Sequence, residues 1–247
     1  MEKQQYKSPD TLTEKEKWDS LNISGKVQYI WDYYKLPIII FFIILYAISY
    51  SVYRHATHKD VALYTALVNV SVGESLQEQL TDQFLETQGI DILKNKFTLY
   101  TGWYLTDDEM SEYHEYTYAT RMKILGAIDA EQLDVILMNK EAFDAFSQNG
   151  YLYNLEELLT DMNPGLYQSL QSNLVTNTEI LKDNSQDIIF DSSLEYVAET
   201  EAYPMAVDLQ SSNIIKNAGF SDTVYFGIIK NTPRINTAVQ YLGYLFS

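Results

Sequence analysis

The sequence predicts an α/β protein with one transmembrane helix, followed by a mostly parallel sheet with helical crossovers. The first observation is an uncharged run at residues 36–53, LPIIIFFIILYAISYSVY. The second is the alternation, from residue 60 onward, of β-rich apolar runs with segments of helical periodicity. We therefore expect cytosolic juxtamembrane helices at residues 1–35, a membrane span at 36–53 and an extracytoplasmic domain at 60–247.

The uncharged run has the length and the flanks of a membrane span. At ~1.5 Å per helical residue it covers roughly 27 Å, close to the ~30 Å hydrocarbon core of a bilayer. Aromatic residues suited to the headgroup region lie near both of its ends: Trp31, Tyr33, Tyr34, Tyr50 and Tyr53. A buried core helix would carry a polar face, which residues 38–45 lack. A signal peptide cleaved near Ala47-Ile48-Ser49 is the other alternative, although the preceding region is long and not strongly basic.

Charge predicts the orientation of the chain. The formal net charge is −17, and residues 60–247 hold 28 acidic against nine basic residues. Basic residues near the two ends of the run almost balance, but Lys15 and Lys17 add to the N-terminal side. We expect a single-pass protein of the cell membrane, with a cytoplasmic N-terminus, an extracellular C-terminal domain and the lipid bilayer as its first partner.

Composition excludes several kinds of site. The chain has no cysteine, which excludes disulfides, thiolate metal sites, a cysteine nucleophile and a lipid-modified cysteine anchor. The acidic domain would repel phosphates, so we expect no nucleic-acid partner.

Helix signals precede the membrane span. Thr13-Glu14-Lys15-Glu16 has the form of a capping box and predicts a short helix through Leu21. Ser24 is predicted to cap a second helix that continues to Tyr34. Both are expected at the inner membrane face, with a surface for a partner helix as the alternative.

The first half of the domain reads as three strand and helix pairs. Strands are predicted at 61–70, 97–105 and 133–138, and helices at 76–88, from Thr106 to about Gly126, and at 140–148. This order is typical of a parallel sheet. The second half is less regular: helices are predicted at 155–159, 166–182, 211–217 and from Pro233 onward, a turn at 163–165, and strands at 188–190, 202–209 and 224–229.

Three segments carry a resemblance to a known family. They are DVILMNKEAFDAFSQNGYLYNLEELL at 134–159, YPMAVD at 203–208 and VYFGIIKNTPRINTAVQYLGYLF at 224–246. Together they resemble extracellular solute-binding proteins with the type 2 periplasmic-binding fold. The resemblance implies a single or reduced lobe, because only about 164–201 is left for a second one. It also implies a Gram-positive bacterium, with a helix in place of the usual lipid anchor.

Aromatic residues mark the candidate ligand site. The chain has 21 tyrosines, and several gather with Trp103 around the second predicted strand. Trp103 and Tyr104 lie near the carboxyl end of that strand, where open α/β sheets bind ligands. Aromatic rings can stack on a carbohydrate or peptide ligand. The alternative is that the same residues pack in the hydrophobic core.

No motif supports catalysis, a metal or a cofactor. His55 and His58, and His114 between two glutamates, fit exposed helix faces better than sites. Asp183-x-Ser185-x-Asp187 lacks the glycine and glutamate of a calcium loop. We expect a non-catalytic binding or accessory subunit beside a membrane complex or transporter. The alternative is a structural or scaffold protein of a cell-envelope complex without a small-molecule ligand.

Overall fold

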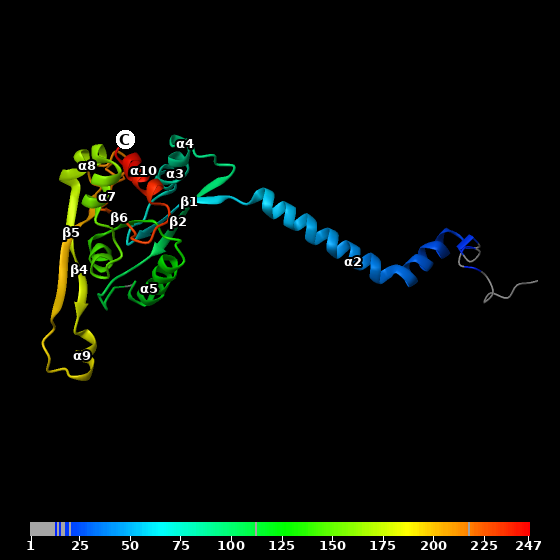
Figure 1. Ribbon diagram of the computed structural model, residues 1–247, viewed down its shortest axis with the longest axis horizontal. Coiled ribbons are helices and arrows are strands. Elements are labelled where there is room, and N and C mark those ends of the chain that lie inside the picture. The colour runs from blue at the N-terminus through cyan, green and yellow to red at the C-terminus, as the bar shows by residue number, and fades with distance from the viewer. Residues whose placement is uncertain (1–12, 14, 16–17, 20, 112, 217) are drawn as a thin grey trace, which may run out of the picture. The chain divides into compact units, whose positions relative to one another are not determined.

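The computed structural model describes residues 13, 15, 18–19, 21–111, 113–216 and 218–247 (Figure 1). The chain divides into two compact units, Met1–His58 and Lys59–Ser247. Each unit is described by itself below.

The first unit is dominated by one long helix. Helix α2 runs without interruption over Ile23–Thr57, and the side chain of Asn22 caps it by accepting a hydrogen bond from the Gly25 amide at 2.7 Å. The helix predicted from Ser24 to Tyr34 is present, but Asn22 caps it in place of Ser24, and it continues into the apolar run as the first part of α2. The capping box predicted at Thr13–Glu16 lies partly outside the described residues.

Within α2, residues Tyr34–His55 form the candidate membrane span. This span has 22 residues with a mean hydropathy of 2.2, and none of its residues is buried. At ~1.5 Å per residue they cover about 33 Å. In the described part of the chain this is the one helix long and apolar enough to cross a bilayer. A helix exposed on every side is not a core helix, and it fits a single-pass anchor or a signal sequence.

The second unit is built on one six-stranded sheet with strand order β2-β1-β3-β6-β5-β4. Strand β1 pairs in parallel with β2 and β3, whereas β3–β6, β6–β5 and β5–β4 are antiparallel. The strands are β1 Asp60–Val68, β2 Asn95–Trp103, β3 Val135–Met138, β4 Leu174–Asp183, β5 Ala198–Asp208 and β6 Tyr225–Ile228. The predicted α/β class is confirmed, but the sheet is mixed and not mostly parallel.

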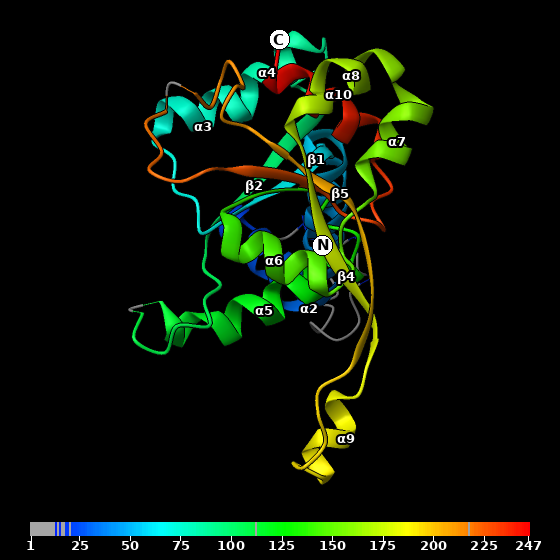
Figure 2. The same cartoon turned by 90° about the vertical axis from the view of Figure 1, so that its left-hand side faces the viewer.

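Helices cover both faces of this sheet, as Figure 2 shows. Alternate side chains of β1 and β3 enter two separate hydrophobic clusters, one with α3, α4, α7, α8 and α10 and the other with α5 and α6. The helices are α3 Glu74–Leu80, α4 Asp82–Thr87, α5 His114–Asp129, α6 Lys140–Gln148, α7 Leu155–Met162, α8 Pro164–Leu170, α9 Ser185–Phe190 and α10 Ile235–Leu245. The 3-10 helix η2 spans Gln171–Asn173.

Several predicted elements differ from the structure, among them the helix predicted at 76–88, which is divided at Thr81 into α3 and α4. The helix predicted at 166–182 is α8 followed by strand β4, and the strand predicted at 188–190 is helix α9. The helix predicted at 211–217 is a series of turns over its described residues. The helix predicted to start at Thr106 begins at His114, because the Thr106 hydroxyl accepts a hydrogen bond from the Asp108 amide and closes a local turn instead.

Candidate functional site

Two asparagines join the carboxyl ends of the parallel strands. Asn69, which follows β1, accepts a hydrogen bond from the Leu105 amide at 2.9 Å and donates to the Leu105 carbonyl at 2.6 Å. Its side chain also donates to Asn139 at 3.1 Å, and Asn139 caps α6 through the Ala142 amide. The φ angle of Asn69 is 57°, a left-handed conformation that asparagine tolerates better than most residues. The loop after β2 and the start of α6 are thereby fixed to the end of β1.

A cavity of about 540 Å³ lies beside this junction, between the loop after β2 and helices α5 and α6. Four charged side chains, Asp107, Arg121, Glu141 and Asp144, lie on its walls, together with apolar side chains such as Ile124 and Phe146. The remaining lining residues are Leu105, Leu125, Ala145, Gln148, Asn149 and Tyr151.

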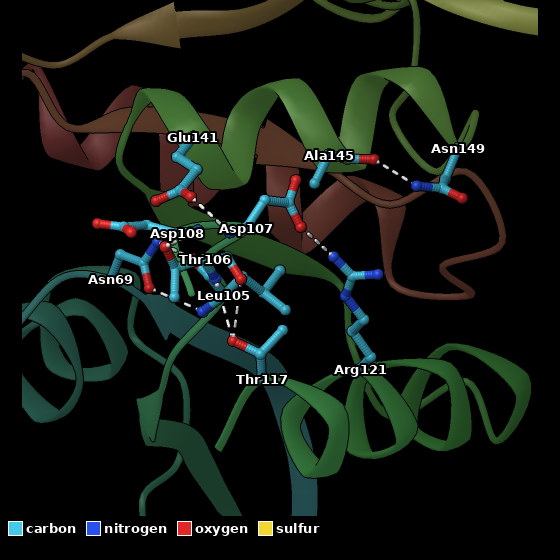
Figure 3. A network of polar contacts seen from close by, with 10 residues as sticks. All are labelled: Asn69, Leu105, Thr106, Asp107, Asp108, Thr117, Arg121, Glu141, Ala145 and Asn149. Carbon is cyan, nitrogen blue, oxygen red and sulfur yellow. Dashed lines mark hydrogen bonds and ion pairs between the residues drawn. The ribbon is translucent and has the colours of Figure 1, made fainter. Parts of the chain in front are cut away.

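The charged walls are held by a hydrogen-bonded network, drawn in Figure 3. The Arg121 guanidinium forms an ion pair with Asp107 at 2.6 Å, and Glu141 accepts a hydrogen bond from the Asp107 amide at 2.9 Å. The Thr117 hydroxyl accepts from the Thr106 amide at 3.1 Å. The loop is therefore tied to both helices by these hydrogen bonds and this ion pair.

A second cavity of about 600 Å³ adjoins the first at the start of α6, and the two share Glu141 and Asp144. Asp144 forms an ion pair with Lys140 and accepts a hydrogen bond from Asn177 at 2.8 Å, which links α6 to β4. The lining of the first cavity thus combines three carboxylates and one guanidinium with apolar side chains such as Ile124 and Phe146. Such a lining can hold a polar ligand by hydrogen bonds and charge pairing.

The structure places the predicted ligand residues outside this cavity. The Trp103 side chain is 7% exposed and stacks on Tyr100 with ring centroids 4.9 Å apart. Tyr100 stacks in turn on Tyr64, over which the Arg234 guanidinium lies at 4.7 Å. Trp103 therefore fills the core at the position predicted for ligand contact.

Tyr104 is half-buried and stacks on Tyr113, with centroids 4.1 Å apart. The next residue, Leu105, does line the cavity. Arg121 and Glu141 are cavity residues that were not predicted. Glu141 carried a usable signal, since it lies in the first turn of a helix that follows a buried parallel strand, whereas Arg121 carried none.

Among the described residues, no group of three or more His, Asp or Glu side chains is placed to hold a metal ion.

A third polar cluster lies where β4, β5 and Lys230 meet. Glu179 forms an ion pair with the Lys230 ammonium at 2.7 Å and accepts a hydrogen bond from the Tyr203 hydroxyl. Burial on its own would raise the pKa of Glu179, but the hydrogen bonds from Lys230 and Tyr203 together outweigh it and lower the pKa below its ordinary value of 4.5. The folded state therefore holds this carboxylate ionised to lower pH than the unfolded chain does.

This shift predicts a pH dependence of stability. We expect Glu179→Gln to be less stable than the wild type near pH 7, and the difference to shrink as the pH falls below 4.5. The sign follows because a lowered pKa adds stability above the unfolded pKa, and this stability is lost on protonation. Urea unfolding of the variant and the wild type between pH 3 and pH 7 measures this difference in the free energy of unfolding. Glu199→Gln, on an exposed part of β5, is the matched control, and a difference that stays constant with pH would contradict the assignment.

The candidate site is thus the cavity between α5, α6 and the loop after β2. Its charged walls are positioned by the two asparagines and by the network around Asp107. Comparison with known proteins assigns no function to this cavity, because no protein-family model matches the chain and no curated protein matches it significantly.

Proposed function

We propose that this chain is a single-pass membrane protein whose α/β domain lies outside the cytoplasm. There it acts as a non-catalytic binding or accessory subunit beside a membrane complex such as a transporter. The exposed apolar helix α2 supports the anchor. The resemblance of 134–159, 203–208 and 224–246 to extracellular solute-binding proteins of the type 2 class supports a binding role for the domain.

The observation that carries the binding role is the cavity of about 540 Å³. Its size is within the range of small-molecule sites, roughly 300–1,000 Å³. One end lies at the loop after β2, where a parallel strand ends, and ligands of open α/β sheets bind at such ends. Carboxylates and a guanidinium suit the hydroxyls of a sugar or the charged termini of a peptide.

A structural protein of a cell-envelope complex, without a small-molecule ligand, is the second candidate. The filled core around Trp103 favours it, since the aromatic side chains at that strand end pack on one another and leave no space there.

A thermal-shift screen of the full chain in detergent separates these candidates. A ligand that binds only the folded state at about 100 times its Kd stabilises it by roughly 2.7 kcal/mol. We expect a sugar, oligosaccharide, peptide or amino acid to raise the melting temperature, and Arg121→Ala to abolish the rise. Lys123→Ala, an exposed lysine of the same helix outside the cavity, is the matched control. A flat screen, or a rise that survives Arg121→Ala, would refute ligand binding in this cavity.

Protease protection on intact cells tests the orientation. We expect external protease to digest the domain after Lys59 and to leave the segment before Lys35 intact, because the bilayer shields the cytoplasmic side. Digestion of both parts after permeabilisation is the control. A domain that becomes accessible only after permeabilisation would refute the proposed orientation.

A further inference from the structure

The β4–β5 hairpin extends beyond the rest of the sheet. Strands β4 and β5 pair from Leu174↔Val207 out to Asp183↔Ala198, whereas β5 pairs with β6 only at Val207 and Asp208. Figures 1 and 2 show the outer part of this ribbon projecting from the domain, with helix α9 at its end. We call residues 181–201 the hairpin tip.

The hairpin tip exposes large apolar side chains. Their exposed fractions run from 45% at Leu194 to 88% at Phe190. The others are Leu181, Ile189, Tyr196 and Val197, each more than half exposed. Soluble domains rarely expose several such side chains within one short segment, and a patch of this kind marks an interaction site.

Polar contacts hold the hairpin tip in a defined conformation. The Asn184 side chain accepts a hydrogen bond from the Val197 amide at 2.8 Å and donates to the Glu195 carbonyl at 2.8 Å. Asp191 accepts from the Ser193 amide at 3.0 Å, and the Tyr196 hydroxyl donates to Asp183 at 3.2 Å. A surface that is already ordered loses less conformational entropy when it binds.

Acidic residues accompany the apolar ones. The hairpin tip contains one basic residue, Lys182, and six acidic ones: Asp183, Asp187, Asp191, Glu195, Glu199 and Glu201. Hydrogen bonds from Ser185 and Ser193 lower the pKa of Asp183 and Asp191 respectively, so both stay ionised at neutral pH. An anionic lipid surface would be repelled by these charges, and so would the same acidic surface of a second copy.

We infer that the hairpin tip docks into an apolar groove of another protein, and that lysine and arginine side chains line the rim of this groove. Phe190, the most exposed of the apolar side chains, is the anchor that enters the groove. The acidic residues pair with the basic rim, which speeds association and excludes partners of the wrong charge. The inference needs no ligand in the cavity, so it stands or fails separately from the proposed function.

Photocrosslinking of the full chain in the cells that produce it tests the inference. The probe is Phe190→p-benzoylphenylalanine, and the control carries the same probe at Tyr118, which is 76% exposed on α5. We expect an adduct with a different protein from position 190 and none from position 118. The crosslinked peptide of that protein should be flanked by lysine or arginine.

The triple variant Asp187→Asn, Asp191→Asn and Glu195→Gln supplies the decisive comparison. Amides keep the hydrogen-bond acceptors of the hairpin tip but remove the charge, and all three side chains are exposed, so the melting temperature should change little. We expect this variant to lose most of the adduct. An adduct that persists at full yield would overturn the inference. So would an adduct of twice 28.5 kDa, an adduct with lipid, or no adduct above that of position 118.

Discussion

Asp134→Ala is expected to lower the free energy of unfolding by about 3–5 kcal/mol, the cost of breaking a buried ion pair from one side. The Asp134 side chain is fully buried and binds the Arg234 guanidinium at 2.8 Å and the Tyr64 amide at 2.7 Å. Thr232 donates a further hydrogen bond to it. Without the carboxylate, Arg234 loses its counter-ion and the Tyr64 amide loses its acceptor, while both stay largely shielded from water.

The effect is measured by urea unfolding of the full chain in detergent, with far-UV circular dichroism as the signal. The Asp107–Arg121 pair is the matched control, since it joins the same two residue types at 2.6 Å but its Asp107 side chain is 84% exposed. Asp107→Ala should cost at most about 1 kcal/mol. Equal losses in the two variants would show that burial does not decide the strength of the Asp134 pair.

Phe84→Ala is expected to cost a similar amount, about 3–5 kcal/mol, through a cavity in the core. Phe84 is fully buried and makes edge-on contacts with Tyr241 at 4.9 Å and Tyr244 at 5.4 Å between ring centroids. Tyr241 is itself fully buried and donates a hydrogen bond to the Leu80 carbonyl at 3.0 Å. The surrounding rings are therefore held in place and cannot close the space that the mutation leaves.

The same unfolding measurement applies, with Phe190→Ala as the matched control. It removes the same side chain from a position that is 88% exposed, and we expect a change within about 0.5 kcal/mol. If Phe84→Ala cost no more than Phe190→Ala, the aromatic cluster around Tyr241 would not be part of the stabilising core.

The elements that could be predicted from sequence are those with local signals. Helix α6 begins and ends where predicted, because Asn139 caps its start and Asn149-Gly150 stops it. Strand β1 is close to its predicted range, since a continuous apolar run fits a strand buried on both faces. The apolar part of α2 was also evident, from the absence of charge alone.

The elements that could not be predicted depend on contacts between distant residues. The sequence predicts a helix where strand β4 lies, because the polar residues of β4 carry no clear period of two. Only pairing with β5, which follows α9, makes this segment a strand. Likewise β6 is adjacent to β3 in the sheet although about 90 residues separate them, so its antiparallel direction was not visible. Arg121 and Glu141 reach one cavity from two helices, and spacing in the sequence does not show that.

The continuity of α2 has a mechanical consequence. Its 35 residues make a helix of about 52 Å at ~1.5 Å per residue, longer than the ~30 Å hydrocarbon core, and the helix continues through Pro37. The part before Tyr34 has no loop that would uncouple it from the apolar span. A displacement of the Ile23 end, for instance at the exposed Trp31 ring, is therefore passed along helical backbone to the apolar part of α2. A loop at residue 35 would absorb that displacement, whereas a continuous helix passes it on to residues 36–53.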